Sequence, residues 1–294
     1  MVVRESAAVE AAQLEAEVAG LDALELAAGD EPGRLAQVWS ALWPKLAAVA
    51  LFFGVWQLLV WTHWKPEYNL PSPFTVLENF GTEASKADFW DAILRTMKRA
   101  FTGYALAVAV GSVIGALVSR VSILRRAVGS MITGLQTMPS IAWLPLAVLL
   151  FTLSESAIMF VVILGAAPSI ANGLISGIDH VPPLLLRSGK MLGASRLGMY
   201  RHVILPASMP AYVHGLKQGW AFAWRSLMAG ELLVIVAGHP SIGSKLQFSR
   251  DFSDAPGLYS WMIVIFVLGV VADSLFGRAD AAIRRRWGLI DTMA

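Results

Sequence analysis

The sequence predicts an all-α, polytopic membrane protein with about six transmembrane helices, and two observations lead to this fold class. The chain of 294 residues is 56% hydrophobic and only 15% charged, whereas soluble domains carry about 25% charged residues. The charges also leave five gaps of 18 to 28 residues, and a stretch of that length without charge is a candidate span. These features exclude a soluble enzyme, a disordered protein and a DNA-binding module. Because cysteine is absent, disulfides, thiol nucleophiles and Cys-ligated metals are excluded as well.

The first element is an acidic extension over residues 1–33. It holds one Arg and eight acidic residues, a net charge of −7, whereas the rest of the chain has a net charge of +9. The early Glu5 and Glu10 argue against a signal peptide, which needs a basic start and an early apolar run. We expect a cytoplasmic helix over 5–28, which is either a solvated extension or a docking helix for a partner.

The next elements lead into and across the membrane. Apolar residues at helical spacing and two Trp predict an interfacial helix over 34–43. A first span is expected at 46–64, followed by a polar, Pro-rich stretch at 65–86. A helical pattern at 87–99 then runs into a second span at 100–118.

The third span is predicted to be broken. The gap at 127–154 is too long for a simple span and contains Pro139 and Pro145, and Pro removes a backbone donor and clashes with the preceding helical turn. The break is therefore expected near 138–145. Three further spans are expected at 156–178, 215–237 and 258–277, separated by a long polar segment at 179–214 and a loop at 238–256.

The distribution of basic residues predicts the orientation. Six spans place both termini on one side, and a cytoplasmic N-terminus puts 15 Lys or Arg inside and seven outside. The positive-inside rule favours this arrangement. The protein is therefore predicted to be a multi-pass protein of the bacterial inner (cytoplasmic) membrane with both termini cytoplasmic, and 179–214 is its largest cytoplasmic segment.

That cytoplasmic segment is predicted to be a helical hairpin. Helix-forming stretches at 184–192 and 195–202 are separated by Gly193, and Pro206 is expected to stop the second. A rigid hairpin of this kind suits a surface that transmits force to another protein.

The residues of the hairpin resemble the cytoplasmic signature of ATP-binding-cassette (ABC) importer permeases. That signature is Glu-Ala-Ala, three residues, Gly, nine residues, Ile, one residue and Leu-Pro. Here Gly193, Leu205 and Pro206 match, Val203 replaces Ile, and the Glu-Ala-Ala triplet is absent from 187–189. Three other segments resemble the nitrate/sulfonate/taurine branch of these permeases, so that the resemblance covers about 34–290: Leu70–Pro73, Met138–Leu146, and Trp220–Trp224 with Glu231.

The resemblance implies a permease domain at 34–294 with the type I importer fold. It implies a second permease copy, two cytoplasmic ABC ATPase subunits, an extracytoplasmic substrate-binding protein and a surrounding lipid bilayer, with no nucleic acid. ATP and Mg would be bound by the partner ATPase, so no cofactor is expected in this chain, which is not an enzyme. The hairpin residues expected to contact the ATPase are Gly193, Ala194, Ser195, Arg196, Tyr200, Arg201, Leu205 and Pro206.

Two charges inside the fifth predicted span are candidates for the translocation path. Intramembrane charges are costly and usually face a partner or a wet path. Arg225 either contacts an anionic substrate or forms a structural pair, for instance with Asp273. Glu231 is expected to form a gate or a structural hydrogen bond. The further path candidates are Pro139, Trp143 and Trp224.

Glycine patterns allow two further interpretations. The segment 238–245 imitates a phosphate-binding loop, but its Ser and Lys stand in the wrong order, so the chain is expected to have no ATPase of its own. Small-residue pairs, which permit close helix approach, are expected to pack within the subunit or at a dimer seam: Gly111 with Gly115, and Gly173 with Gly177.

The predicted function is thus import of a small anionic solute, with an aliphatic sulfonate favoured and nitrate, taurine, bicarbonate or a pyrimidine-like precursor left open. A secondary transporter is a rival, although we see no inverted repeat. A membrane-anchored interaction protein that works through its acidic tail is a second rival.

Overall fold

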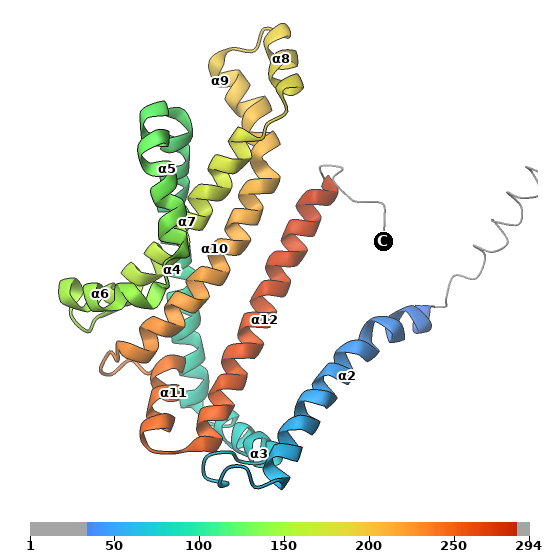
Figure 1. Cartoon of the computed structure of the whole chain (residues 1–294), viewed down its shortest axis with the longest axis vertical. Coiled ribbons are helices and arrows are strands. Elements are labelled where there is room, and N and C mark those ends of the chain that lie inside the picture. The colour runs from blue at the N-terminus through green and yellow to red at the C-terminus, as the bar shows by residue number, and fades with distance from the viewer. Residues whose placement is uncertain (1–33, 287–294) are drawn as a thin grey trace, which may run out of the picture. The chain divides into compact units, whose positions relative to one another are not determined.

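The computed structural model describes residues 34–286, and every regular element in that range is helical (Figure 1). This confirms the predicted all-α class. The chain divides into two compact units, of which the first ends at Trp64 and the second begins at Lys65. The predicted acidic extension at 1–33 lies outside the described residues.

The described part of the first unit is one helix, α2 (Arg34–Trp61). The predicted interfacial helix at 34–43 is not separate, because Pro44 lies inside α2 and the helix continues through it. Its apolar part, Leu42–Trp61, is long enough to span a bilayer. Only 6% of that stretch is buried within the chain, so nearly all of its side chains are free to meet lipid or another protein.

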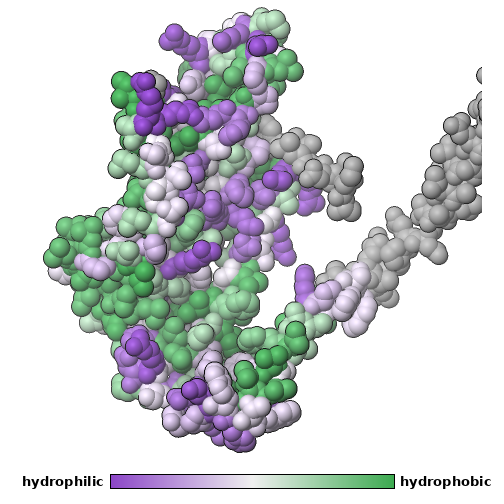
Figure 2. Space-filling view, in the orientation of Figure 1, coloured by the Kyte–Doolittle hydropathy of each residue, from purple (hydrophilic) through white to green (hydrophobic). Residues whose placement is uncertain are grey.

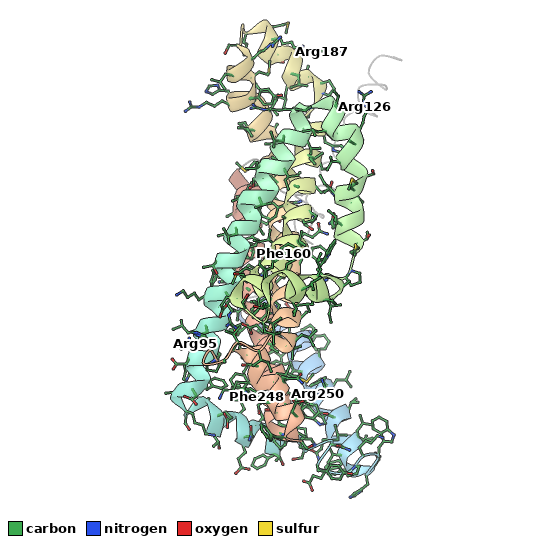
Figure 3. All side chains as sticks on the ribbon, turned by 90° about the vertical axis from the view of Figure 1, so that its left-hand side faces the viewer. Arg95, Arg126, Phe160, Arg187, Phe248 and Arg250 are labelled. Carbon is green, nitrogen blue, oxygen red and sulfur yellow. The ribbon has the colours of Figure 1, made fainter. Side chains whose placement is uncertain are left out.

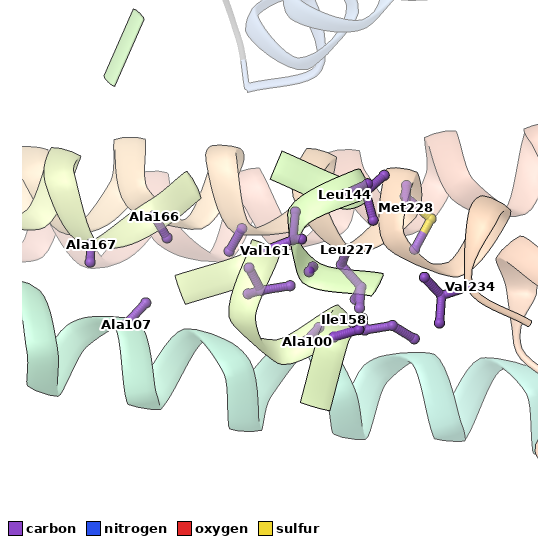
Figure 4. Packing of buried hydrophobic residues seen from close by; sticks show 14 of the residues in the cluster. Ala100, Ala107, Leu144, Ile158, Val161, Ala166, Ala167, Leu227, Met228 and Val234 are labelled. Atoms are coloured by element: carbon purple, nitrogen blue, oxygen red, sulfur yellow. The ribbon is translucent and has the colours of Figure 1, made fainter. Parts of the chain in front are cut away.

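Three long helices form the centre of the second unit: α4 (Ala87–Arg120), α7 (Glu155–Asp179) and α10 (Leu205–Leu233). Helix α7 packs against both α4 and α10 (Figure 1). The core between them is made mostly of Ala, Val, Ile and Leu side chains, and Ile158, Val161 and Leu227 are completely buried (Figure 4).

Glycines allow these three helices to approach closely. A Cβ atom on Gly111 would lie 2.6 Å from the carbonyl oxygen of Ala167 on α7, and one on Gly173 would lie 2.6 Å from Cα of Gly215 on α10. A Cβ atom on Gly115 would lie 2.9 Å from the carbonyl oxygen of Ala171 on α7, and one on Gly177 would lie 2.6 Å from that of Ser208 on α10. All four glycines of the predicted pairs therefore pack within the subunit.

The third predicted span is broken. Helix α5 (Ser122–Thr137) ends before Pro139, and a short 3-10 helix η1 (Ser140–Trp143) leads into α6 (Leu144–Phe151). The two halves meet at 104°. Met138, which precedes Pro139, is extended, as the residue before a proline prefers, and the helix therefore cannot continue through it. Hydrophobic side chains gather over α6 (Figure 2).

Among the described residues, four helices are long and apolar enough to span a membrane, and the bent pair makes a fifth candidate. The four are α2, α4, α7 and α12 (Ala255–Arg286). The remaining predicted span lies in α10, which at 29 residues is long enough. Three charged residues, Lys217, Arg225 and Glu231, are spread along the predicted span in α10.

Two short helices near one end of the unit correct the predicted loops. Helix α3 (Pro73–Ala84) occupies part of the stretch 65–86, and α11 (Ile242–Asp251) occupies part of the loop 238–256. Each has a Ser N-cap, Ser72 and Ser241, of which the latter forms a capping box with Ser244. A cluster around Phe89, Ile242 and Trp261 buries the apolar sides of these elements.

The prediction that Pro206 stops the hairpin helix is wrong. Pro206 is the second residue of α10 and directly follows a π-helical turn, so the chain passes through it as a helix with a local change in the hydrogen-bond pattern. Helix α9 (Arg196–Met199) continues through a π-helical turn, η2 (Tyr200–Ile204), directly into α10. The chain is therefore helical without interruption from Arg196 to Leu233.

Candidate functional site: a helical hairpin and a buried carboxylate network

The hairpin at one end of the second unit is formed by α8 (Pro183–Met191) and α9 (Figure 1). Gly193 turns the chain between them with a φ of 73°, a conformation that favours glycine. The N–H of Gly193 donates to the carbonyl of Lys190 at 3.0 Å, and the N–H of Ala194 donates to that of Gly189 at 3.1 Å. Ser195 then caps α9 by accepting from the N–H of Gly198 at 3.1 Å. The predicted turn at Gly193 is confirmed.

The two arms of the hairpin pack through Gly189. A Cβ atom there would lie 3.0–3.1 Å from Met199 and Val203 side chains, which is tighter than ordinary van der Waals contact. Gly189 is the last residue of the segment 187–189, where the Glu-Ala-Ala triplet is absent. Close packing at a glycine thus holds the arms together in this chain.

The exposed surface of the hairpin combines apolar and basic side chains. Met191 and Leu192 at its tip are 84% and 87% exposed, and such exposed apolar groups mark interaction sites when they cluster. Arg187 projects at this end of the molecule (Figure 3). The other exposed basic residues of the hairpin are Lys190, Arg196 and Arg201.

Two contacts that sequence reasoning missed fix the base of the hairpin. The Arg120 guanidinium, at the end of α4, lies 4.7 Å from the centre of the Tyr200 ring. Arg125 of α5 forms an ion pair with Asp179 at the end of α7. Tyr200 is accordingly half-buried, whereas the predicted contact residues Ala194, Ser195 and Arg196 are exposed. Leu205 is exposed and Pro206 is half-buried where α10 begins.

The opposite end of α10 carries a buried polar network centred on Glu231. This carboxylate is completely buried. It accepts hydrogen bonds from the Thr96 hydroxyl at 2.9 Å, from Arg99 Nη1 at 2.8 Å and from the Gly243 N–H at 3.1 Å. Thr96 in turn accepts from the Ile242 N–H at 3.0 Å. Two N–H groups at the start of α11 are therefore bound by the network.

Arg99 extends this network to a second carboxylate. It donates through Nε and Nη2 to both oxygens of Glu155, the first residue of α7, with an Nε–Oε2 distance of 2.7 Å. The Arg99 side chain is 8% exposed, whereas that of Glu155 is 46% exposed. We refer to Thr96, Arg99, Glu155 and Glu231 as the carboxylate network. The sequence had identified only Glu231, because Arg99 lies in a stretch predicted to flank a span.

The structure separates Arg225 from Glu231, as their spacing along a helix predicts. Arg225 is exposed, and its guanidinium lies 5.6 Å from the centre of the Phe222 ring. Asp273, the partner considered for it, instead forms an ion pair with Lys217 at 3.5 Å. Within residues 34–286, no ion pair to Arg225 is found.

The other path candidates lie on different elements. Pro139 is exposed at the break of the bent span, and Trp143 is half-buried against the core. Trp224 lines an open groove of about 360 Å³ between α10 and α12, together with Phe266, Gly269 and Asp273. The groove is therefore lined by two aromatic rings, those of Trp224 and Phe266, and by Asp273, whose carboxylate is paired with Lys217.

Comparison with known proteins identifies the family. Residues 74–285 match the family described as "Binding-protein-dependent transport system inner membrane component". The chain is 26% identical over 244 residues to the taurine transport system permease protein of Escherichia coli, covering 79% of this chain and 87% of that one. It is 25% identical over 244 residues to the nitrate import permease protein of Leptolyngbya laminosa, covering 80% and 85%.

The fold has a counterpart among solved structures. A chain of the methionine ABC transporter MetNI, in an inward-facing conformation, superposes with a TM-score of 0.57 at 18% identity, covering 68% of this chain and 99% of that one. The helical order, the bent span and the hairpin thus occur together with a family match that covers most of the chain. The protein belongs to the inner membrane components of binding-protein-dependent transport systems and is a permease component of an ABC importer.

Proposed function

We propose that this permease imports a small anion, best described as an aliphatic sulfonate, with energy supplied by a separate ATPase. The exposed hairpin that continues into a membrane-length helix is the observation that carries the proposal, because it joins a protein-binding surface to the body of the permease. The likeness to a taurine permease supports the substrate class, since taurine is an aminosulfonate.

The ATPase partner is proposed to bind the hairpin. Its exposed tip, Met191 and Leu192, would enter an apolar groove, and the surrounding basic side chains would meet acidic ones. ATP and Mg would be bound by that partner. Two copies of the permease and two ATPase subunits would form the complex, with the solute passing between the permeases.

The proposed orientation places the hairpin in the cytoplasm, together with both termini. Basic residues support this, because the predicted arrangement puts 15 Lys or Arg on the hairpin side and seven on the other. Arg126 and Arg187 lie at the hairpin end of the unit, and Arg95 and Arg250 lie toward the other end (Figure 3). The end that carries α3 and α11 then faces outward and would meet the substrate-binding protein. Phe252, which follows α11 and is 81% exposed, is available for such a contact.

Replacing Leu192 by aspartate is expected to abolish co-purification of the ATPase with the permease. The substitution puts a charge into the apolar centre of the proposed interface, where it would be desolvated without a partner. Pull-down of the co-expressed ATPase measures the effect. Phe252→Asp, an equally exposed apolar residue at the opposite end, is the matched control and should retain the ATPase. Equal retention in both variants would contradict the proposed binding surface.

Replacing Arg225 by alanine is expected to abolish transport while assembly of the complex and basal ATPase activity persist. Arg225 has no ion-pair partner among the described residues, so its removal leaves no carboxylate unpaired. Uptake of labelled taurine into proteoliposomes, assayed with the binding protein present, measures the effect. Loss of the assembled complex would instead show that Arg225 is structural.

The substrate itself is best tested on the binding protein. Mass spectrometry of the ligand that co-purifies with it is expected to show an organic sulfonate. Nitrate is the second candidate, because a nitrate permease is about as similar to this chain as the taurine permease is. Uptake that is driven by an ion gradient without ATP would overturn the ABC mechanism and favour a secondary transporter.

A further inference from the structure

The carboxylate network joins four helices at the end of the molecule opposite the hairpin. Thr96 and Arg99 belong to α4, Glu155 begins α7, and Glu231 lies on α10. Through Gly243 the network also binds the first turn of α11. Since a Cβ atom on Gly243 would lie 2.4 Å from Cβ of Glu231, α11 and α10 are in direct contact here.

The two carboxylates bound to Arg99 differ in whether they can leave it. Glu231 is completely buried, so breaking its bond to Arg99 would leave an ion without water or a cationic partner. The Glu155 side chain is 46% exposed, so water can replace Arg99 around it. If Glu155 leaves, Arg99 and Glu231 still form a neutral pair. Only the Arg99–Glu155 bond can therefore open at low cost.

The backbone next to Glu155 favours movement at the same place. Thr152, which joins α6 to α7, has a φ of 59° and a ψ of −165°. This region is almost restricted to glycine and is strained for a threonine. The strained turn connects the second half of the bent span to the residue that Arg99 holds. Release of Glu155 would allow this turn to relax and α6 to move relative to α4.

We propose that Arg99 and Glu155 form a releasable clasp, with Glu231 as its fixed anchor, which keeps the outward end of the permease closed until ATP drives it open. The inference rests on the proposed function, because it assigns the clasp to the transport cycle. Arg99 and Glu155 act as positioning residues: they hold the α6–α7 turn against α4, and contact with the solute is not required.

The functional test uses the permease with its ATPase in proteoliposomes. Glu155→Gln keeps the shape of the side chain but removes its charge. Basal ATPase activity without binding protein is expected to rise about fivefold, the lower end of coupling effects between linked sites, and the solute imported per ATP to fall. Glu155→Asp should restore most of the coupling. Asp280→Asn, which removes a surface ion pair with Arg284, should change neither quantity.

A merely structural role predicts a different result. Transport and ATPase activity would then fall together in Glu155→Gln, with an unchanged ratio of solute to ATP, and this outcome would overturn the clasp. If the wild-type complex imports nothing with ATP, the proposed function fails instead. The two failures are thus distinguishable, because the second is seen without any substitution.

A distance measurement tests the clasp independently of transport. The sequence has no cysteine, so spin labels can be placed at Lys98→Cys and Leu153→Cys alone. Dilution of the labelled permease with unlabelled permease then isolates the separation of α4 from the α6–α7 turn within one copy. Both positions are exposed. In this background Glu155→Gln is expected to lengthen and broaden the distance distribution of the purified protein. An unchanged distribution would overturn the proposal whatever the transport activity.

Discussion

Replacing Arg99 by alanine is expected to destabilise the permease by about 3–5 kcal/mol, the range for breaking a buried ion pair by removing one partner. The Glu231 carboxylate would keep only the Thr96 hydroxyl and the Gly243 N–H, with no cation to balance its charge. The loss would be measured by thermal unfolding in detergent and by the amount of protein that accumulates in membranes.

The neighbouring Lys98 supplies a matched control for this substitution. It is exposed one residue earlier on the same helix, so Lys98→Ala should leave the unfolding temperature almost unchanged, as is usual for surface substitutions. The double variant Arg99→Met with Glu231→Met removes both buried charges and should recover much of the stability. Equal stability of Arg99→Ala and the wild type would contradict a structural role for the network.

Replacing Gly215 by leucine is expected to prevent correct packing of α7 against α10. A Cβ atom at this position would lie 2.8 Å from Cα of Gly173 and 3.1 Å from the carbonyl oxygen of Ser169. Both are backbone atoms, so neither can rotate away as a side chain can. The cost should equal or exceed the roughly 1–3 kcal/mol typical of overpacked cores, and loss of monodisperse protein in size-exclusion chromatography would report it.

Gly277 on α12 supplies the control, because a leucine there would not meet the backbone of another helix. Apart from its chain neighbours and the adjacent backbone of α12, no atom of the described residues lies within 4 Å of a Cβ built there, so Gly277→Leu should leave the elution profile intact. If Gly215→Leu behaved like Gly277→Leu, the close approach of α7 and α10 would be refuted.

Much of the helical order could be predicted from the sequence, because apolar stretches without charge have few alternatives to a span. The bent third span could be placed from Pro139 and Pro145, whose effect on a helix is local. The turn at Gly193 was predictable for the same reason. Pro206 was misjudged, because a proline usually ends a helix, whereas here the chain stays helical and adopts a π-helical turn directly before it.

The helices α3 and α11 were harder to predict from their composition. Each is short and mostly polar, and its apolar side becomes apparent only when Phe89 and Trp261 are packed against it. Their Ser-capped starts, Ser72 and Ser241, were the available signal.

The network around Glu231 could be predicted only in part. A carboxylate within a span requires a partner, but Arg99 is 132 residues away in the sequence, and only the packing of α4 beside α10 brings the two together. The position of Arg225 on another face of α10 did follow from its spacing to Glu231.

Because the helix is unbroken from Arg196 to Leu233, a rotation at the hairpin is transmitted along it to the opposite end. The distance along it from the hairpin to Glu231 is about 50 Å, at 1.5 Å per residue. A tilt of about 5° at the hairpin would therefore displace Glu231, together with the Arg99 that it anchors, by roughly 4–5 Å on this geometry, more than the 2.7 Å between Arg99 and Glu155. A small rotation imposed at one end thus becomes, at the other, a movement large enough to rearrange hydrogen bonds.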